Sequence, residues 1–209
     1  MFALIENQQI TKFYSGNKGV TLGDIQYPRS IFTLWSEAER NAIGIFEVTV
    51  DTTNKKDEQW YINTDISYGV ESNKAVGSYG AATAKAIDDT LWTQEDSDNG
   101  LLPSDKSVGD VKVEGLKTIK KRIVKQQAAG ILQDTDWYIT RKADASTAVP
   151  SAITTHRAAV RTKSGEMETA IDNASDVDAL ATLYEYVNTG TEENPVYERP
   201  LGEFPVLEN

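Results

Sequence analysis

The chain offers few side chains that could do chemistry. His156 is the single histidine and there is no cysteine, so a histidine-based catalytic triad, a multi-histidine metal site and a thiolate site are excluded within this chain. Asp134 and Asp136 precede Trp137 and could suggest the paired carboxylates of a glycosidase. Acidic residues are also favoured at the start of a helix, where they complement its dipole. We interpret the two aspartates in this way, and His156 as a surface or seam residue of a helix.

A calcium site is the next chemistry to consider. The segment DSDNG, Asp96–Gly100, resembles the opening of a calcium loop. An EF-hand needs oxygen ligands at loop positions five and twelve, and here Gly100 and Ser107 stand at those positions. We interpret the segment as an acidic, solvated turn.

Phosphate binding and acid–base catalysis have equally weak signals. The glycines of SGNKGVTLGD lack the order of a phosphate-binding loop and read as turn residues: Gly16, Gly19 and Gly23. Glu37 and Glu39 follow Ser36 in the pattern of a capping box, in which first-turn carboxylates stabilise a helix start. We therefore predict no catalytic, cofactor-binding or metal-binding residue and no enzyme activity.

Aromatic residues on the strands suggest one binding function. Side chains on an exposed sheet face can stack on sugars, and this would be the alternative use of Trp60, Tyr61, Tyr68 and Tyr79. Core and cross-strand packing is the plainer explanation for aromatics in strands. A host glycan is therefore the weaker of the two hypotheses.

The charge of the chain argues against partners that carry phosphates. The net charge of the 209 residues is −11 at pH 7, which repels nucleic acid and anionic membrane surfaces. One basic stretch, Lys112–Lys125, has no interleaved aromatic residue, and we interpret it as a solvated helix face that offsets acidic neighbours. No apolar run approaches the roughly 20 residues that would cross a bilayer, so we expect no membrane insertion. The opening residues do not resemble a secretory signal, and the lack of cysteine suits a reducing cytoplasm.

The elements expected in the first half are mostly strands. Alternating apolar residues predict an opening hairpin, a capped helix, a strand and a second hairpin, over residues 2–14, 36–44, 45–50 and 59–79. Residues 81–93 fit either another strand or a short helix.

The second half has helical periodicity. A helix from Leu116 is expected to be interrupted or ended by Gly130, and Pro150-Ser151 opens another through Ile171. Between them Trp137, Tyr138 and Ile139 are predicted to form a compact apolar plug. Arg157 and Ser164 occupy seam positions of the helix over 153–171, so a helix in a small bundle is favoured over a strict coiled coil. Ser175 and Asp178 are expected to cap a last helix that ends towards Asn188 and Gly190 and forms a helical hairpin with its predecessor.

These expectations together predict an α+β protein. A β-rich domain spans 1–93, a polar linker 94–112, a small helical bundle 113–189 and an extended, proline-rich arm 190–209. The apolar residues of the arm would either pack back on the chain or dock on a neighbour.

Two stretches resemble a known group of proteins. The segment 137–171, with DWYITRK and RAAVRTKSGEMETAI, followed by ASDVDAL, resembles the C-terminal helical region of tail accessory proteins of tailed bacteriophages, which are associated with tail fibres or their assembly. The segment 28–48, with a proline, a helix start S-x-x-E-R and AIGIFEV, resembles an N-terminal piece of the same proteins. Together the two stretches cover about a third of the chain.

The resemblance implies a function without an active site. We expect a structural adaptor at the tail tip or fibre attachment region, made in the bacterial host cytoplasm and located in the virion, with other tail or tail fibre proteins as partners. A tail fibre assembly chaperone absent from mature virions is the alternative, and a carbohydrate-binding module for host recognition is a third hypothesis. Whether the chain also forms a homo-oligomer stays open.

Overall fold

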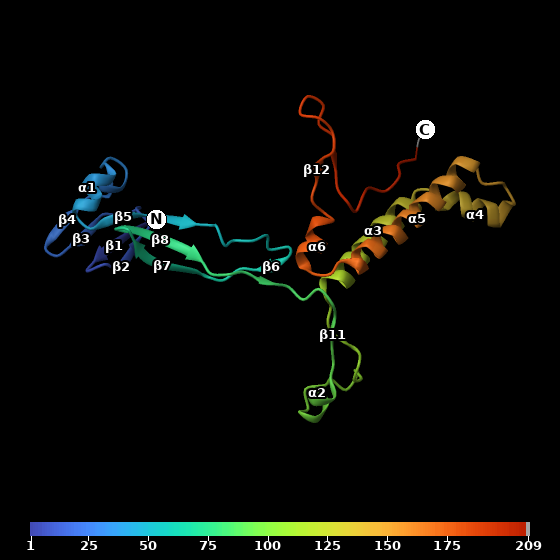
Figure 1. The fold of residues 1–209 in the computed structure, drawn as a ribbon, viewed down its shortest axis with the longest axis horizontal. Coiled ribbons are helices and arrows are strands. Elements are labelled where there is room, and N and C mark those ends of the chain that lie inside the picture. The colour runs from blue at the N-terminus through green and yellow to red at the C-terminus, as the bar shows by residue number, and fades with distance from the viewer. Residues whose placement is uncertain (208–209) are drawn as a thin grey trace. The chain divides into compact units, whose positions relative to one another are not determined.

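The computed structural model describes residues 1–207, and the last two residues of the expected arm, 208–209, lie outside this range. The chain divides into two compact units, Met1–Thr83 and Ala84–Asn209, whose helices and strands are labelled in Figure 1. The first unit is rich in strands and the second holds the longer helices, so the protein has a mixed α+β fold with its helical part towards the C-terminus. The segment expected to be a linker, 94–112, lies within the second unit.

Five strands of the first unit form one sheet with the order β2-β1-β5-β8-β7. Two further pairs, β3 with β4 and β6 with β9, lie outside this sheet. The elements are, in chain order, β1 (Phe2–Glu6), β2 (Gln9–Tyr14), β3 (Val20–Leu22), β4 (Ile25–Tyr27), the 3₁₀ helix η1 (Arg29–Phe32), α1 (Glu37–Ala42), β5 (Ile45–Asp51), β6 (Tyr61–Ile62), β7 (Ile66–Glu71), β8 (Lys74–Tyr79) and β9 (Thr83–Ala84).

Both expected hairpins are confirmed, as β1–β2 and β7–β8. Each turns through two successive residues with positive φ, Asn7 and Gln8 in the first and Ser72 and Asn73 in the second. Such turns match the twist of antiparallel strands, and asparagine tolerates them well. The second hairpin was expected from residue 59, but its first strand begins at Ile66, because residues 63–65 are not part of a strand.

β5 joins the two hairpins into one sheet. Its first half pairs with β1 in antiparallel register, Leu4 opposite Ile45, and its second half pairs with β8 in parallel register, Val48 opposite Ala75. The parallel pairing was not predicted, because nothing in either strand marks a partner so far along the chain.

The start of α1 agrees with the predicted capping box. The Ser36 hydroxyl accepts a hydrogen bond from the Glu39 N–H, and the Glu39 carboxylate accepts one from the Ser36 N–H at 2.8 Å. These two bonds satisfy donors that a helix start otherwise leaves without partners.

The core of the first unit lies where β1, β5 and the segment after β2 meet. It is made of buried apolar side chains packed against half-buried aromatics, and the Phe2 and Phe32 rings lie 4.7 Å apart between centroids. The fully or nearly buried members are Val20, Ile31, Phe32 and Ile45. Burying four such side chains contributes on the order of 1.5–3 kcal/mol each.

The second unit is built on a pair of long helices. Its elements are β10 (Thr90–Leu91), α2 (Gln94–Asp98), β11 (Val111–Val113), α3 (Leu116–Gln133), α4 (Asp136–Ala145), α5 (Ser151–Asn173), α6 (Val177–Thr182), β12 (Val187–Asn188) and β13 (Tyr197–Glu198). β10 pairs with β11 and β12 with β13, each in antiparallel register.

α3 and α5 pack side by side and run in opposite directions. Ion pairs between them show the direction, because Lys121 bonds Asp172 at 2.6 Å while Lys125, one turn further along α3, bonds Glu168 at 3.2 Å, one turn earlier along α5. The buried face of α5 repeats at alternating spacings of four and three residues: Ile153, Arg157, Val160, Ser164, Met167 and Ile171. Arg157 and Ser164, which were placed at seam positions from the sequence, are therefore buried with the apolar residues.

Three predictions for the helices were wrong. Gly130 lies inside α3, where its missing side chain weakens the helix without ending it. The last helix is capped by Asp176, whose carboxylate accepts from the Ala179 N–H at 2.8 Å, and it ends at Thr182. The main helical hairpin is α3 with α5, since α6 is too short to cover α5.

Residues 190–207 combine a strand with an irregular stretch. β13 pairs with β12, and the Leu201 N–H donates to the Leu183 carbonyl at 3.0 Å, which places the buried Leu201 side chain against its own unit. Beyond it, Pro205, Val206 and Leu207 line pockets beside α5. Leu201 is thus covered by its own unit, whereas Val206 is 85% exposed.

Candidate interaction surface

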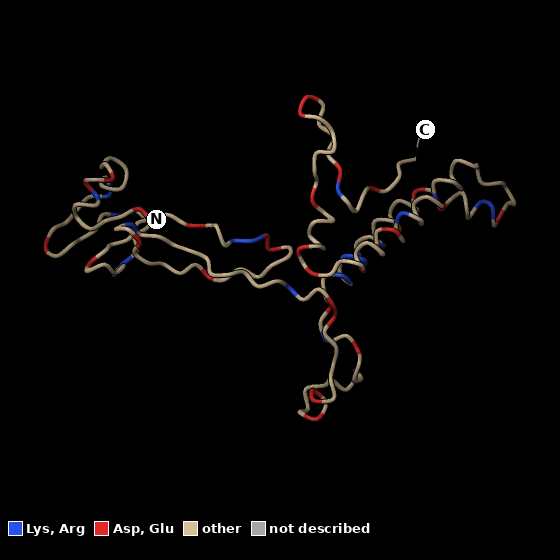
Figure 2. The backbone as a smooth tube through the Cα atoms, viewed as in Figure 1, with Lys and Arg blue, Asp and Glu red and all other residues tan. Residues whose placement is uncertain are grey.

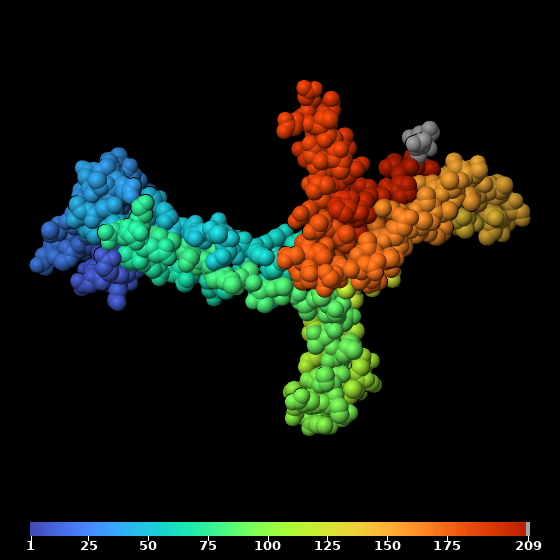
Figure 3. Space-filling view, in the orientation of Figure 1, coloured from blue at the N-terminus to red at the C-terminus, as the bar shows by residue number. Residues whose placement is uncertain are grey.

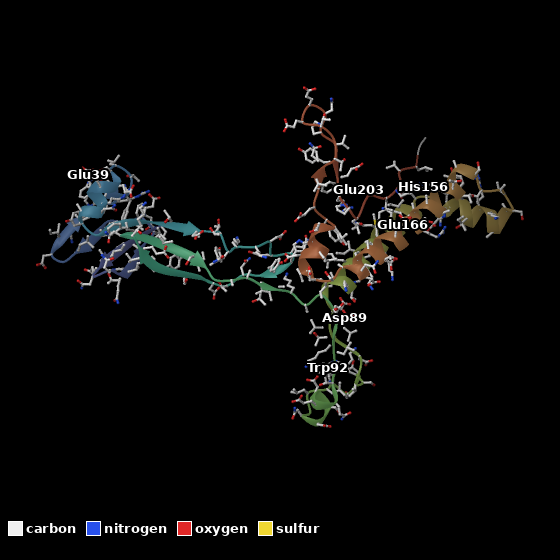
Figure 4. All side chains as sticks on the ribbon, in the orientation of Figure 1. Glu39, Asp89, Trp92, His156, Glu166 and Glu203 are labelled. Atoms are coloured by element: carbon white, nitrogen blue, oxygen red, sulfur yellow. The ribbon has the colours of Figure 1, made fainter. Side chains whose placement is uncertain are left out.

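His156 lies on α5, facing the C-terminal segment, and is only 8% exposed (Figure 4). It lines two open pockets of about 420 and 340 Å³ together with Pro205, Val206 and Leu207. His156 was expected to be a surface or seam residue, and it is buried rather than at the surface.

The two aspartates near Trp137 have structural roles. Asp134 is the residue that ends α3, and Asp136 starts α4 and pairs with Arg157, with its Oδ1 atom 2.8 Å from Nη2. The Arg157 guanidinium also donates to the Leu132 carbonyl at 2.7 Å and to the Thr135 hydroxyl at 2.6 Å. The buried Arg157 thus adds a charged donor at the carbonyl end of α3, where the Asp134 and Thr135 N–H groups also donate to the Leu132 carbonyl.

The calcium-like segment is a short capped helix. Asp96 is the third residue of α2, and its carboxylate accepts from the Thr93 N–H and hydroxyl and from Lys112 Nζ at 2.6 Å. The Lys112 ammonium and these donors lower the pKa of Asp96 to about 2. Lys112 also lies 4.5 Å from the centre of the Trp92 ring, which Figure 4 labels. Among residues 1–207 no three acidic or histidine side chains are grouped as metal ligands would be.

The other sequence candidates also have structural roles. Gly16 and Gly23 adopt positive φ in turns. Hydrogen bonds from Ser36 lower the pKa of the Glu39 carboxyl (Figure 4), so its role is to cap α1.

The aromatic residues considered for sugar binding do not share one exposed surface. Trp60 and Tyr61 are buried, at 6% and 9% exposure. Tyr68 packs edge-on against Phe13 with 4.9 Å between ring centroids, and Lys55 lies over the ring of Tyr79. Of the four, Tyr68 has the most accessible ring.

The basic stretch Lys112–Lys125 is largely matched by acidic residues. Besides the two ion pairs to α5, Lys117 pairs with Asp88 at 3.3 Å and Arg122 with Glu114 at 2.6 Å. These pairs confirm the prediction that the stretch offsets acidic neighbours.

The start of α3 is held by residues that precede it by about 30 positions. Its N-cap is Gly115, which has no side chain, and the Asp89 carboxylate takes that role by accepting from the Gly115 N–H at 2.7 Å and the Thr118 hydroxyl at 2.9 Å (Figure 4). These two donors lower the pKa of Asp89. Sequence reasoning missed this arrangement, because the capping residue lies outside the local sequence.

The next two donors of α3 are satisfied in the same way. The Leu116 N–H donates to the Ala86 carbonyl at 2.9 Å and the Lys117 N–H to the Ile87 carbonyl at 3.0 Å. The backbone approaches so closely that a side chain at Gly115 would collide with the Asp88 carbonyl group and come within 2.7 Å of the Ile87 oxygen.

The predicted apolar plug is the main error in the second unit. α4 has no buried residue, and the side chains of Trp137 and Ile139 are 51% and 43% exposed. α4 has ten residues and lies at one end of α3 and α5. No further element of the described chain covers its outer face, so its large side chains stay at the surface.

Trp137 and Tyr138 form a surface cluster with a guanidinium group. The Arg141 guanidinium lies 4.5 Å from the centre of the Trp137 ring and 5.5 Å from that of Tyr138. Its Nε atom is buried and has no hydrogen-bond partner among the described residues. Cation–π contact with the two rings holds the group in place.

Beside this cluster lies an open pocket of about 320 Å³ between α4 and α5. Its walls combine the cations Lys142, Arg157 and Arg161 with apolar and hydroxyl side chains: Ile139, Ala148, Val149 and Thr154. We name Trp137, Ile139, Arg141, Lys142 and Arg161 the α4 corner.

The α4 corner differs from α3 in the partners of its cations. Within the described residues, Arg141, Lys142 and Arg161 form no ion pair with a carboxylate, whereas α3 carries a row of them. Figure 2 shows that α4 and α5 carry both basic and acidic residues. In a chain of net charge −11, this is a site where an acidic group from a partner would be attracted.

The two hairpins of the second unit also expose apolar side chains. On and beside β12–β13 these are Tyr186, Val187, Val196 and Tyr197, and on and beside β10–β11 they are Leu91, Val108, Val111 and Val113. In the space-filling view each hairpin is a narrow projection (Figure 3). Isolated two-stranded hairpins are marginally stable in water, so a covering partner would stabilise both.

No described helix combines the length and the apolar character that crossing a bilayer requires. Comparison of the chain with protein-family models, with curated proteins and with solved structures finds no match.

Proposed function

We propose that the protein is a structural adaptor of a tailed bacteriophage, located in the virion at the tail tip or the fibre attachment region. The observation that carries the proposal is the exposure of large apolar and aromatic side chains on three elements of the second unit: α4, the β10–β11 hairpin and the β12–β13 hairpin. Trp, Tyr and Arg are enriched where protein interfaces gain most of their energy.

The finer architecture belongs to this proposal. We propose that the C-terminal helices act as a small bundle and that the segment 190–209 acts as a proline-rich contact arm. A β-rich unit and a helical unit, each with its own core, would let one chain contact two tail or tail fibre proteins at once. The resemblance of residues 28–48 and 137–171 to phage tail accessory proteins supplies the biological setting.

Mass spectrometry of purified virions tests the proposal. The expected result is that the chain is present in mature particles at a fixed ratio to known tail proteins and remains after the particles are washed in high salt. Presence in infected lysate with absence from washed particles would refute the structural function and favour the assembly chaperone. The washed sample serves as the control for adventitious adsorption.

A further inference from the structure

We propose that the protein associates with itself head to tail, with the β12–β13 hairpin of one copy bound at the α4 corner of a second copy. The inference goes beyond the adaptor function and does not depend on it, because both surfaces lie on this chain.

The chemistry of the two surfaces is complementary. Residues 185–198 contain four glutamates and no lysine or arginine, and two of them, Glu192 and Glu193, lie exposed between β12 and β13. The α4 corner offers Arg141, Lys142 and Arg161 without carboxylate partners among the described residues. Opposite charges of this kind steer association and fix its register.

The apolar parts match as well. Val196 and Tyr197 on the hairpin are 50% and 64% exposed, and the α4 corner presents Trp137 and Ile139 beside an open pocket. A bare phosphate or a nucleic-acid backbone would satisfy the cations and leave these apolar side chains uncovered. A protein segment with both acidic and apolar side chains covers both, and the hairpin is such a segment.

Hydrogen bonds within the hairpin constrain its loop. The Asn188 side-chain oxygen accepts from the N–H groups of Gly190 and Val196 at 3.0 Å each, and the Thr189 N–H donates to the Val196 carbonyl at 2.7 Å. Because the loop is already constrained, less conformational entropy is lost when it binds.

The two surfaces are attached at opposite ends of α3. The α4 corner follows the C-terminal end of α3, while the hairpin begins beside Tyr184, whose ring lies 4.8 Å from Lys120 Nζ in the first turns of α3. From Lys120 to the end of α3 is roughly 20 Å at 1.5 Å per residue. A contact between different surfaces at opposite ends is heterologous and can extend from copy to copy.

Sedimentation velocity of the full chain tests the association. The expected result is a concentration-dependent dimer or longer oligomer that weakens as salt rises. Lys142→Glu and Glu193→Lys should each weaken association about tenfold. Lys106→Glu, an equal charge change at an exposed lysine outside both surfaces, should leave it unchanged. A chain that is monomeric at every concentration, or an oligomer that the first two variants do not weaken, would overturn the proposal.

Mixing the two variants distinguishes this contact from any other. Lys142→Glu keeps an intact hairpin and Glu193→Lys keeps an intact α4 corner, and the two substituted side chains are again of opposite charge, so the mixture should associate more strongly than either variant alone. Failure of the mixture to form dimers, when each variant is folded by circular dichroism, would overturn the head-to-tail arrangement. The same would follow if a short oligonucleotide bound the α4 corner of a chain that stays monomeric.

Discussion

The backbone of residues 86–89 lies close to the start of α3, and this contact leads to a prediction about Gly115. Replacement of Gly115 by alanine should destabilise the second unit. The added methyl group would meet the Asp88 carbonyl group and lie 2.7 Å from the Ile87 oxygen, and relief of these contacts requires a shift on the order of 1 Å. Such a shift breaks the bonds from Leu116 and Lys117 to the Ala86 and Ile87 carbonyls, which are 2.9 and 3.0 Å long.

The expected magnitude follows from those two bonds. Each contributes about 1 kcal/mol net, and the Leu116 N–H is buried, so its loss costs about 1–3 kcal/mol more. We expect Gly115→Ala to lower the free energy of unfolding by about 3–5 kcal/mol. The assay is urea denaturation followed by far-ultraviolet circular dichroism, together with hydrogen exchange in the first turn of α3.

Gly130→Ala is the matched control on the same helix. A side chain at Gly130 would meet nothing within 4 Å, so the substitution should stabilise α3 by about 1 kcal/mol through helix propensity alone. Opposite signs for the two variants are the expected result. If Gly115→Ala were as stable as the native chain to within about 0.5 kcal/mol, the close approach of the backbone could not be as described.

The remaining predictions concern the packing of α5 against α3, the buried Arg157 and the effect of acid on α2. Met167→Ala should cost about 2–5 kcal/mol in urea denaturation because the side chain is 1% exposed, whereas Ile123→Ala, at 39% exposure, should cost less than about 1.5 kcal/mol. Arg157→Met should cost about 2–3 kcal/mol, since it removes the hydrogen bonds of the buried guanidinium to the Leu132 carbonyl and the Thr135 hydroxyl and its ion pair with Asp136, and Arg161→Met should change stability by less than about 0.5 kcal/mol; equal effects at the two arginines would refute the assigned role. The pKa of Asp96 is lowered to about 2, so its contribution is complete above the unfolded-state value near 3.8 and is lost as pH falls towards about 2. NMR of the α2 amides should therefore show an acid transition in this range that is absent from Asp96→Asn.

Local patterns predicted the elements that are determined locally. The capping box of Ser36 and Glu39, the two hairpin turns and the start of α5 each depend on residues within a few positions of one another. The interactions that stabilise these features form between residues near in sequence, so the residue types alone predict them.

The rest depended on partners distant in sequence. The parallel pairing of β5 with β8, the capping of α3 by Asp89 and the burial of Arg157 against the Leu132 carbonyl each join residues more than 20 positions apart. Trp137 and Ile139 were misassigned to a core because hydrophobicity alone does not tell whether another element covers a side chain. The α4 corner was for the same reason not predicted as a surface.

The hydrogen bonds from Gly115 and Thr118 to Asp89 also have a consequence for how this protein could diversify. Residues 89 and 115 touch, so everything between them leaves the helical body and returns to the same point. A segment with such closely spaced ends can be lengthened, trimmed or exchanged with little change to the helices that carry it, since closing a longer loop costs only about 0.6 kcal/mol for each doubling of its length. The segment 89–115 could therefore be replaced by a different segment while the helices that carry it stay unchanged.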